Sequence, residues 1–178
     1  DLDAIDANIR PGTLWNVGPR IAELASPHIA AQLNDRSAAA AVDRLKADLA
    51  AFQADHGLES VIVVNVASTE AVPAEETWPA TWAATQALLD QPNCPLPASA
   101  LYAIAALDSG WSYVNFTPSL GATPAGLDEL ARLRGACHAG RDGKTGETLM
   151  KSVLAPMFAA RGLKVMSWVG HNIFGNLD

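Results

Sequence analysis

The clearest periodic pattern of apolar residues lies between Ser37 and His56. Apolar residues recur there at the spacing of one helix face, charged residues fill the other side, and Gly57 follows as a stop signal. The apolar positions are Val42, Leu45, Leu49 and Phe52. This pattern predicts an amphipathic helix from Ser37 to His56.

A nearly continuous run of β-branched residues follows, from Val61 to Val66. Such a run is typical of a strand that is covered on both faces. A helix that leads directly into such a strand predicts a parallel α/β sheet. The polar residues Asn65, Ser68, Thr69 and Glu70 then lie at the carboxyl end of the strand, where open α/β sheets place their ligand crevices. A ligand site and a capped turn are about equally good interpretations of these residues.

Periodicity predicts further elements along the rest of the chain, and prolines divide the segment from Pro73 to Pro97 into short pieces. The predicted helices are Trp78 to Leu89, Ser99 to Leu107, Pro124 to Arg134, and Thr145 to Arg161 despite Pro156; the predicted strands are Trp111 to Phe116 and Leu163 to Val169. A change of domain near Ser109 is only weakly marked.

Composition indicates a packed globular chain, with one domain or two partial ones in its 178 residues. Hydrophobic residues make up 49% and charged residues 17%, a ratio that disfavours disorder. The formal charge of −7 argues against neutralising the phosphates of nucleic acid or an anionic membrane, although a local site for one phosphate is compatible with it. No apolar run reaches the roughly 20 residues that span a bilayer. We therefore expect a cytoplasmic protein with no nucleic-acid or membrane partner.

Neither the cysteines nor the histidines have the spacing of a disulfide framework or a metal site. We expect both cysteines, Cys94 and Cys137, to be small buried residues. The histidines are His28, His56, His138 and His171. We expect no metal-ligating residue among them.

Lys144 and Lys151 are seven residues apart, close to two helical turns, so both ammonium groups could lie along one side of a helix and share an anion. Two exposed lysines on a solvated helix are the simpler interpretation. Gly143, Lys144 and Thr145 also resemble the end of a nucleotide-binding P-loop. That motif is excluded because His138 stands where its first glycine is required.

Four segments resemble the myo-inositol-1-phosphate synthase family. They are KTGETLMKSVLAPMF at 144–158 with Ser167 after it, HNIFGNLD at 171–178, VVNVASTE at 63–70 and YVNFTPS at 113–119. The resemblance covers most of the chain from about residue 58 onward, and its motifs are long and specific.

The resemblance implies part of an NAD-dependent isomerase that converts D-glucose 6-phosphate to 1D-myo-inositol 3-phosphate, the first step of inositol biosynthesis. The reaction would proceed by oxidation at C5, enolisation, ring-closing aldol addition and reduction. The implied fold is α/β. Residues 1–108 would be the later part of a Rossmann-type NAD-binding domain, and 109–178 an incomplete, smaller α/β domain for catalysis and tetramerisation. The implied partners are glucose 6-phosphate and further copies of the chain in a homotetramer.

The family also implies roles for individual residues. Fixed cations would stabilise an enolate and an alkoxide, which makes Lys144 and Lys151 the expected catalytic residues, with Asp142 orienting them. The expected NAD-binding residues are Asn65, Ala67, Ser68, Thr69, Glu70, Asn176 and Asp178; the expected substrate-binding residues are Asn115, Thr117, Ser119, Thr145 and Gly146. The sequence does not decide whether a divalent or monovalent cation assists.

The chain departs from the family in having no Gly-x-Gly-x-x-Gly fingerprint and no further lysines after the last motif. We therefore expect an interior piece of the enzyme that, in isolation, binds NAD weakly and does not turn over. Two alternatives are a non-catalytic core for oligomerisation and an ordinary NAD-dependent dehydrogenase.

Overall fold

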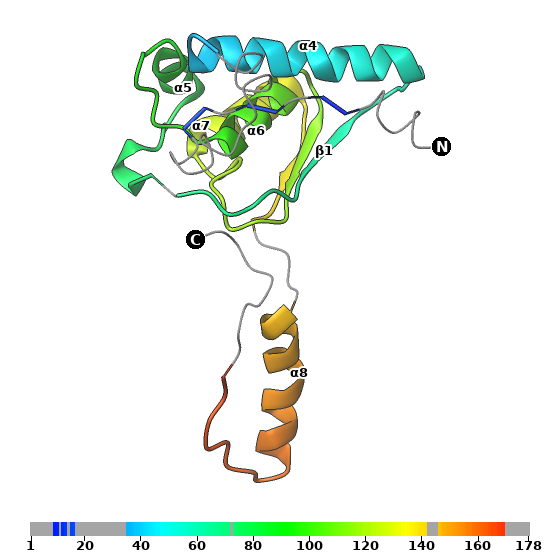
Figure 1. Ribbon diagram of the computed structural model, residues 1–178, viewed down its shortest axis with the longest axis vertical. Coiled ribbons are helices and arrows are strands. Elements are labelled where there is room, and N and C mark those ends of the chain that lie inside the picture. Colours follow the sequence, from blue (N-terminus) through cyan, green and yellow to red (C-terminus); the bar gives the residue numbers. More distant parts are fainter. Residues whose placement is uncertain are drawn as a thin grey trace.

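The described residues form a parallel sheet of three strands with helices packed on one of its faces (Figure 1). The computed structural model describes residues 9–10, 12–13, 15–16, 35–71, 73–141 and 146–169, without the side chains of 146–148. The strands, in their order across the sheet, are β1 (Ile62–Asn65), β2 (Ser112–Asn115) and β3 (His138–Ala139). Because all three run parallel, their carboxyl ends meet at one edge. The predicted α/β class, the parallel sheet and the first two strands are confirmed.

Helix α4 (Ala38–His56) confirms the strongest periodic pattern of the sequence. It starts where the Ser37 hydroxyl accepts a hydrogen bond from the amide of Ala40, at 3.1 Å. It ends at Gly57, whose φ of 59° lies in the left-handed region that glycine adopts without strain. Its buried face packs on α6 (Ala98–Asp108).

Helix α6 forms the middle of the core, because its own apolar and small side chains are buried on every side of the helix. Leu101, Ile104 and Leu107 are almost completely buried. Burial of each such side chain stabilises the fold by about 1.5–3 kcal/mol. Helix α7 (Ala125–Arg134) packs against α6, and α6 in turn packs against β1 and β2. Both helices agree with the sequence prediction.

The segment between β1 and α6 holds a 3₁₀ turn, η1 (Glu75–Thr77), and helix α5 (Trp82–Leu89). The helix predicted from Trp78 therefore begins four residues later. Pro79 disfavours helical geometry at Trp78, and the hydroxyl of Thr81 caps the true start by accepting from the amide of Ala84.

One face of β1 is exposed, so the expectation of a strand covered on both faces is wrong for the described structure. Ile62 is 63% exposed and Val64 is 49% exposed. Val63 points the other way and packs against the core that contains α6. Helix α6 packs on that side of the sheet together with α4 and α7, so alternate residues of the β-branched run stay partly exposed.

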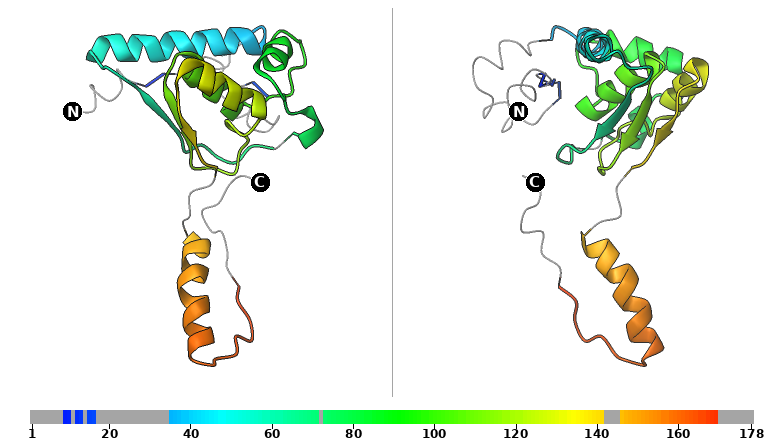
Figure 2. Two further views of the ribbon diagram at one scale, coloured as in Figure 1. Left: turned by 180° about the vertical axis from the view of Figure 1, so that it is seen from behind. Right: turned by 90° about the vertical axis from the view of Figure 1, so that its right-hand side faces the viewer.

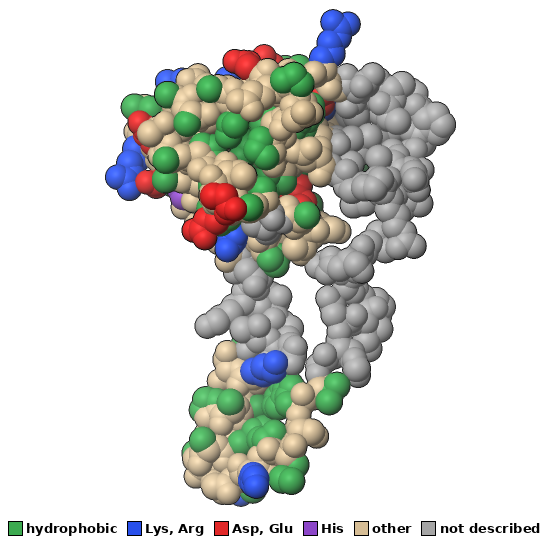
Figure 3. Space-filling model, turned by 90° about the vertical axis from the view of Figure 1, so that its left-hand side faces the viewer, with side chains coloured by type: hydrophobic (Ala, Val, Ile, Leu, Met, Phe, Trp, Pro, Cys, Tyr) green, Lys and Arg blue, Asp and Glu red, His purple; other side chains and the backbone are tan. Residues whose placement is uncertain are grey.

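Helix α8 (Gly146–Ala160) lies apart from the sheet and the other helices (Figures 1 and 2). It confirms the predicted helix, including Pro156 inside it. The strand predicted for Leu163 to Val169 is wrong, because no described residue pairs with this segment and a strand needs a hydrogen-bonded neighbour. Apolar side chains of α8 and of residues 163–169 lie open on the surface (Figure 3).

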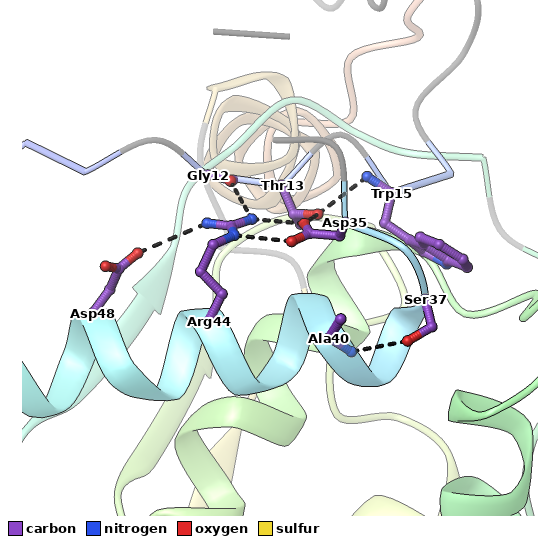
Figure 4. A network of polar contacts seen from close by, with 8 residues as sticks. All are labelled: Gly12, Thr13, Trp15, Asp35, Ser37, Ala40, Arg44 and Asp48. Atoms are coloured by element: carbon purple, nitrogen blue, oxygen red, sulfur yellow. Dashed lines mark hydrogen bonds and ion pairs between the residues drawn. The ribbon is translucent and has the colours of Figure 1, made fainter. Parts of the chain in front are cut away.

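An arginine on α4 anchors the described residues near the start of the chain (Figure 4). The Arg44 guanidinium donates two hydrogen bonds to the carboxylate of Asp35, at 2.7 and 3.0 Å, and one to the carbonyl of Gly12, at 2.9 Å. Hydrogen bonding to Asp35 raises the pKa of Arg44. Asn16 extends the attachment, since its amide donates to the carbonyls of Cys94 and Leu96.

Three other expectations can be compared with the described residues. Cys94 is buried as expected, but Cys137 is exposed because it lies in the turn between α7 and β3. No helix in the described ranges is long and apolar enough to cross a membrane. The sheet takes strands from both sides of Ser109, and the division into 1–108 and 109–178 stays a prediction.

Candidate binding site at the carboxyl edge of the sheet

Two asparagines end the neighbouring strands β1 and β2, directly opposite each other. The side-chain amide of Asn65 donates to Oδ1 of Asn115 at 3.1 Å and to the hydroxyl of Thr117 at 3.2 Å. Oδ1 of Asn65 accepts from the amide of Ala67 at 3.2 Å, which turns the chain out of the strand. Asn65 therefore joins the loops that follow the two strands.

Asn115 uses both ends of its amide to shape the loop after β2. Its Nδ2 donates to the carbonyl of Ser119 at 2.8 Å, and its Oδ1 accepts from the backbone amide and the hydroxyl of Thr117 at 3.0 and 2.8 Å. The hydroxyl of Thr117 accepts from the amide of Ser119 at 3.2 Å. All three residues are buried, and in the described part of the chain no buried side-chain nitrogen or oxygen lacks a partner. The loop is therefore held rigidly by its own polar groups.

Glu70 connects the loop after β1 to α6 and to the loop after β2. Both oxygens of its carboxylate accept from the amide of Ser99, at 3.1 Å each. Its own amide donates to the hydroxyl of Ser119 at 3.0 Å. Burial raises the pKa of the nearby Tyr113 phenol, and the charge of Glu70 adds to that effect. Tyr113 thus stays protonated and donates to the carbonyl of Ser99 at 3.1 Å.

Two glycines let the backbone approach Asn115 closely. A Cβ at Gly121 would lie 2.5 Å from Nδ2 of Asn115, and a Cβ at Gly140 would lie 2.2 Å from its carbonyl oxygen. Both glycines have positive φ, 51° and 108°, which disfavours other residues at these positions. The turn after β2 and the end of β3 can therefore close around the asparagine.

The rim of this buried network faces solvent. Ala67 and Ser68 are exposed after β1, while Phe116, which is 53% exposed, and Pro118 are exposed after β2. The rim offers a hydroxyl, a small residue and an aromatic surface at the carboxyl edge of a parallel sheet. This is the position at which α/β proteins bind nucleotides and similar ligands.

The structure brings together eight of the residues proposed as ligand contacts from the sequence. These are Asn65, Ala67, Ser68, Thr69, Glu70, Asn115, Thr117 and Ser119. Gly146 starts α8, and Lys151 is an exposed residue on that helix, which as a whole lies apart from the sheet in Figure 1. Asp142, Lys144, Thr145, Asn176 and Asp178 lie outside the described residues. The assigned roles of all these residues stay predictions.

Sequence reasoning missed Ser99, Tyr113 and Gly121 as parts of this network. The hydroxyl of Ser99 accepts a hydrogen bond from the amide of Gly121 at 3.2 Å. The backbone amide of Ser99 donates to Glu70, and its carbonyl accepts from the phenol of Tyr113. A serine in the first turn of an otherwise apolar helix was the available signal. Among the described residues, no group of histidine, cysteine or acidic side chains could hold a metal ion.

Comparisons with known proteins agree on one family. The model for the NAD-binding domain of myo-inositol-1-phosphate synthase matches residues 17–163. An inositol-3-phosphate synthase 1 from Bacteroides thetaiotaomicron is 35% identical over 138 residues, which are 77% of this chain and 32% of that protein. The Trypanosoma brucei brucei inositol-3-phosphate synthase is 38% identical over 140 residues, 77% of this chain and 26% of that protein.

The fold also resembles a solved structure. The inositol-3-phosphate synthase of Caenorhabditis elegans matches with a TM-score of 0.60 and 22% identity, over 79% of this chain and 34% of that one. The chain thus spans about a third or less of these relatives. The residues that the family model matches include the whole described sheet and both loops of the candidate site.

Proposed function

The chain belongs to the myo-inositol-1-phosphate synthase family, and we therefore propose that the protein takes part in the NAD-dependent conversion of D-glucose 6-phosphate to 1D-myo-inositol 3-phosphate. The observation that carries the proposal is the hydrogen-bonded contact between the loops after β1 and β2. The two family motifs expected to bind NAD and substrate meet there, so one rigid edge can present both ligands to each other.

The loop after β1 fits part of an NAD site. Exposed Ser68, with Thr69 beside it, supplies hydroxyls that suit ribose or phosphate oxygens, and the small exposed residue Ala67 allows close approach. Asn65 and Glu70 hold this loop from behind through bonds to Thr117, Ser119 and Ser99. NAD, when bound, supplies reversible hydride transfer to and from the sugar. The chain's own contribution is to fix the loop in one position.

The loop after β2 is proposed to contact the sugar phosphate. The side chains of Asn115 and Thr117 bond each other and the backbone of Ser119, so the loop keeps one shape before any ligand arrives. A prearranged loop avoids the cost of ordering at the moment of binding. Thr145 and Gly146 are proposed as further substrate contacts, while Asn176 and Asp178 are proposed for NAD.

Lys144 and Lys151, oriented by Asp142, are proposed to stabilise the negative charge that develops during enolisation and ring closure. A fixed ammonium near a developing oxyanion lowers the barrier because little reorganisation is needed. Lys151 lies on α8, which would have to approach the sheet edge for this role. The proposal therefore needs an assembled full-length enzyme.

The assay that tests the function uses the full-length protein with glucose 6-phosphate and a catalytic amount of NAD, and follows inositol phosphate by ³¹P NMR. Wild type should form product without net NADH, because the hydride is returned within each cycle. Lys151→Ala should abolish product formation, while Lys164→Ala, at an exposed lysine beyond α8, should not. Equal activity of the two variants would refute the role of Lys151, and net NADH with no inositol phosphate would favour a dehydrogenase.

The family also supports a proposal about the surroundings of the protein. We propose a homotetramer in the cytoplasm, with no nucleic-acid or membrane partner. The formal charge of −7 is consistent with this because anionic polymers and membranes would repel it. Size-exclusion chromatography with light scattering on the full-length protein tests the assembly.

A further inference from the structure

Helix α6 has no cap from its own neighbourhood. Pro97 occupies the N-cap position, where it offers no side-chain acceptor, and the first turn contains no acidic residue. The amides at the start of a helix have no partner within the helix and need one from elsewhere. The carboxylate of Glu70, 29 residues earlier in the chain, supplies it for Ser99.

A carboxylate suits this position for two reasons. The helix start carries partial positive charge, and hydrogen bonds to a charged acceptor are stronger than those to a neutral one. Because Glu70 is partly buried, solvent competes weakly for these bonds. The end of the β1 loop is therefore fixed to the most buried helix of the fold.

The same helix start also fixes the loop after β2. The hydroxyl of Ser99 accepts from the amide of Gly121, and the amide of Glu70 donates to the hydroxyl of Ser119. Ser119 is completely buried. A shift of Glu70 would therefore move both loops, and not only its own.

We propose that Glu70 is a positioning residue, which sets the spacing between the loop that holds NAD and the loop that holds the sugar phosphate. This inference rests on the proposed function. It replaces the expected direct contact between Glu70 and NAD, because the carboxylate is engaged with the protein itself. Glu70 acts through Ser99 and Ser119 on the two loops whose residues are proposed to touch the ligands.

Kinetics of the full-length enzyme test the proposal with Glu70→Ala, Glu70→Gln and a control, Glu59→Ala. Glu59 is exposed at the amino end of β1, opposite the site. Misplaced loops should raise KM for both NAD and glucose 6-phosphate on the order of tenfold or more in Glu70→Ala. Glutamine keeps an oxygen acceptor for the amide of Ser99, so its KM values should return to within about threefold of wild type.

The alternatives give different results. A direct contact with NAD predicts a change in KM for NAD alone. A merely structural role predicts a smaller fraction of active enzyme, which lowers kcat and leaves both KM values unchanged. Either result, or a Glu70→Ala enzyme that matches wild type and Glu59→Ala, would overturn the proposal.

Hydrogen exchange on the same four proteins separates this inference from the proposed function. If wild type makes no inositol phosphate, the proposed function fails, and exchange still reports the positions of the loops. Glu70→Ala should then speed exchange at Ser99 and across residues 116–121, whereas Glu70→Gln and Glu59→Ala should not. Unchanged exchange in Glu70→Ala would overturn the positioning role.

Discussion

At the scale of single residues, Asn115 organises the carboxyl edge of the sheet. Its amide bonds three backbone or hydroxyl groups of its own loop and also the side chain of Asn65 on the neighbouring strand. The site is buried, so these groups cannot turn to water when a partner is removed. The cost of losing Asn115 should therefore exceed that of losing an ordinary surface hydrogen bond.

Asn115→Ala should lower the free energy of unfolding by about 2–4 kcal/mol, because the amide of Thr117 and the carbonyl of Ser119 lose their side-chain partner. Urea unfolding followed by tryptophan fluorescence measures this. The control is Asn93→Ala, at an exposed asparagine before Cys94, which should change the free energy by no more than about 0.5 kcal/mol. Equal stability of the two variants would contradict the structural role of Asn115.

The sequence predicted a parallel sheet with polar residues at the end of the first strand, but not which strand ends would meet or how their side chains would share hydrogen bonds. Asn65, Thr117 and Ser119 were identified because they follow β-branched runs or match family motifs. The role of Ser99 depends on its backbone amide and on Glu70, far away in the chain. No local pattern encodes such a contact, because it arises only when the sheet and α6 pack together.

At the scale of elements, Asp108 joins three helices. It ends α6 and forms ion pairs with Lys46 on α4 and with Arg134 at the end of α7, the latter at 2.9 Å. A carboxylate at a helix C-terminus is unfavourable by itself, and the two cations offset that effect. Burial raises the pKa of Asp108, but hydrogen bonds from Lys46 and Arg134 outweigh it and hold the pKa below the ordinary value of 3.8.

Asp108→Asn should cost about 1–2 kcal/mol of unfolding free energy at neutral pH, because both ion pairs are lost. A carboxyl whose pKa is lower in the folded state stabilises the fold above its unfolded pKa, and the contribution is lost as pH falls through the folded value. The difference in unfolding free energy between wild type and variant should therefore stay constant above about pH 5 and become smaller below the ordinary pKa of 3.8. Urea unfolding from pH 3 to 7 tests this, with Asp55→Asn at an exposed site as control. If this difference in unfolding free energy did not change with pH, the ion pairs of Asp108 would be excluded as its cause.

Element prediction succeeded where the pattern alone determines the structure. The helices of residues 38–56, 98–108 and 125–134 follow from apolar spacing and glycine stops, which are local properties. The strand expected at 163–169 failed because alternation does not supply a hydrogen-bonded neighbour. The two-residue strand β3 was missed for the opposite reason: its position comes from pairing with β2, not from its own sequence.

At the scale of the whole molecule, apolar surface is unevenly distributed. The side of β1 that faces α6 is packed, while Ile62 and Val64 on the other side are exposed, as are Val153 and Met166 in and after α8. Exposed apolar side chains that adjoin one another promote association. A polypeptide of this sequence should therefore bind hydrophobic dyes and self-associate more readily than its negative charge suggests.

Ile62→Thr combined with Val64→Thr should reduce dye fluorescence and self-association of such a polypeptide while leaving its circular dichroism unchanged. Threonine keeps the β-branched shape that favours a strand but replaces exposed methyl groups with hydroxyls. The matched control is Val63→Thr, at the intervening position that packs into the core, where an added hydroxyl should instead lower stability and increase dye binding. Dye fluorescence and light scattering at equal concentration measure both effects. If all three proteins bound dye equally, the exposed face of β1 would not be the source of the association.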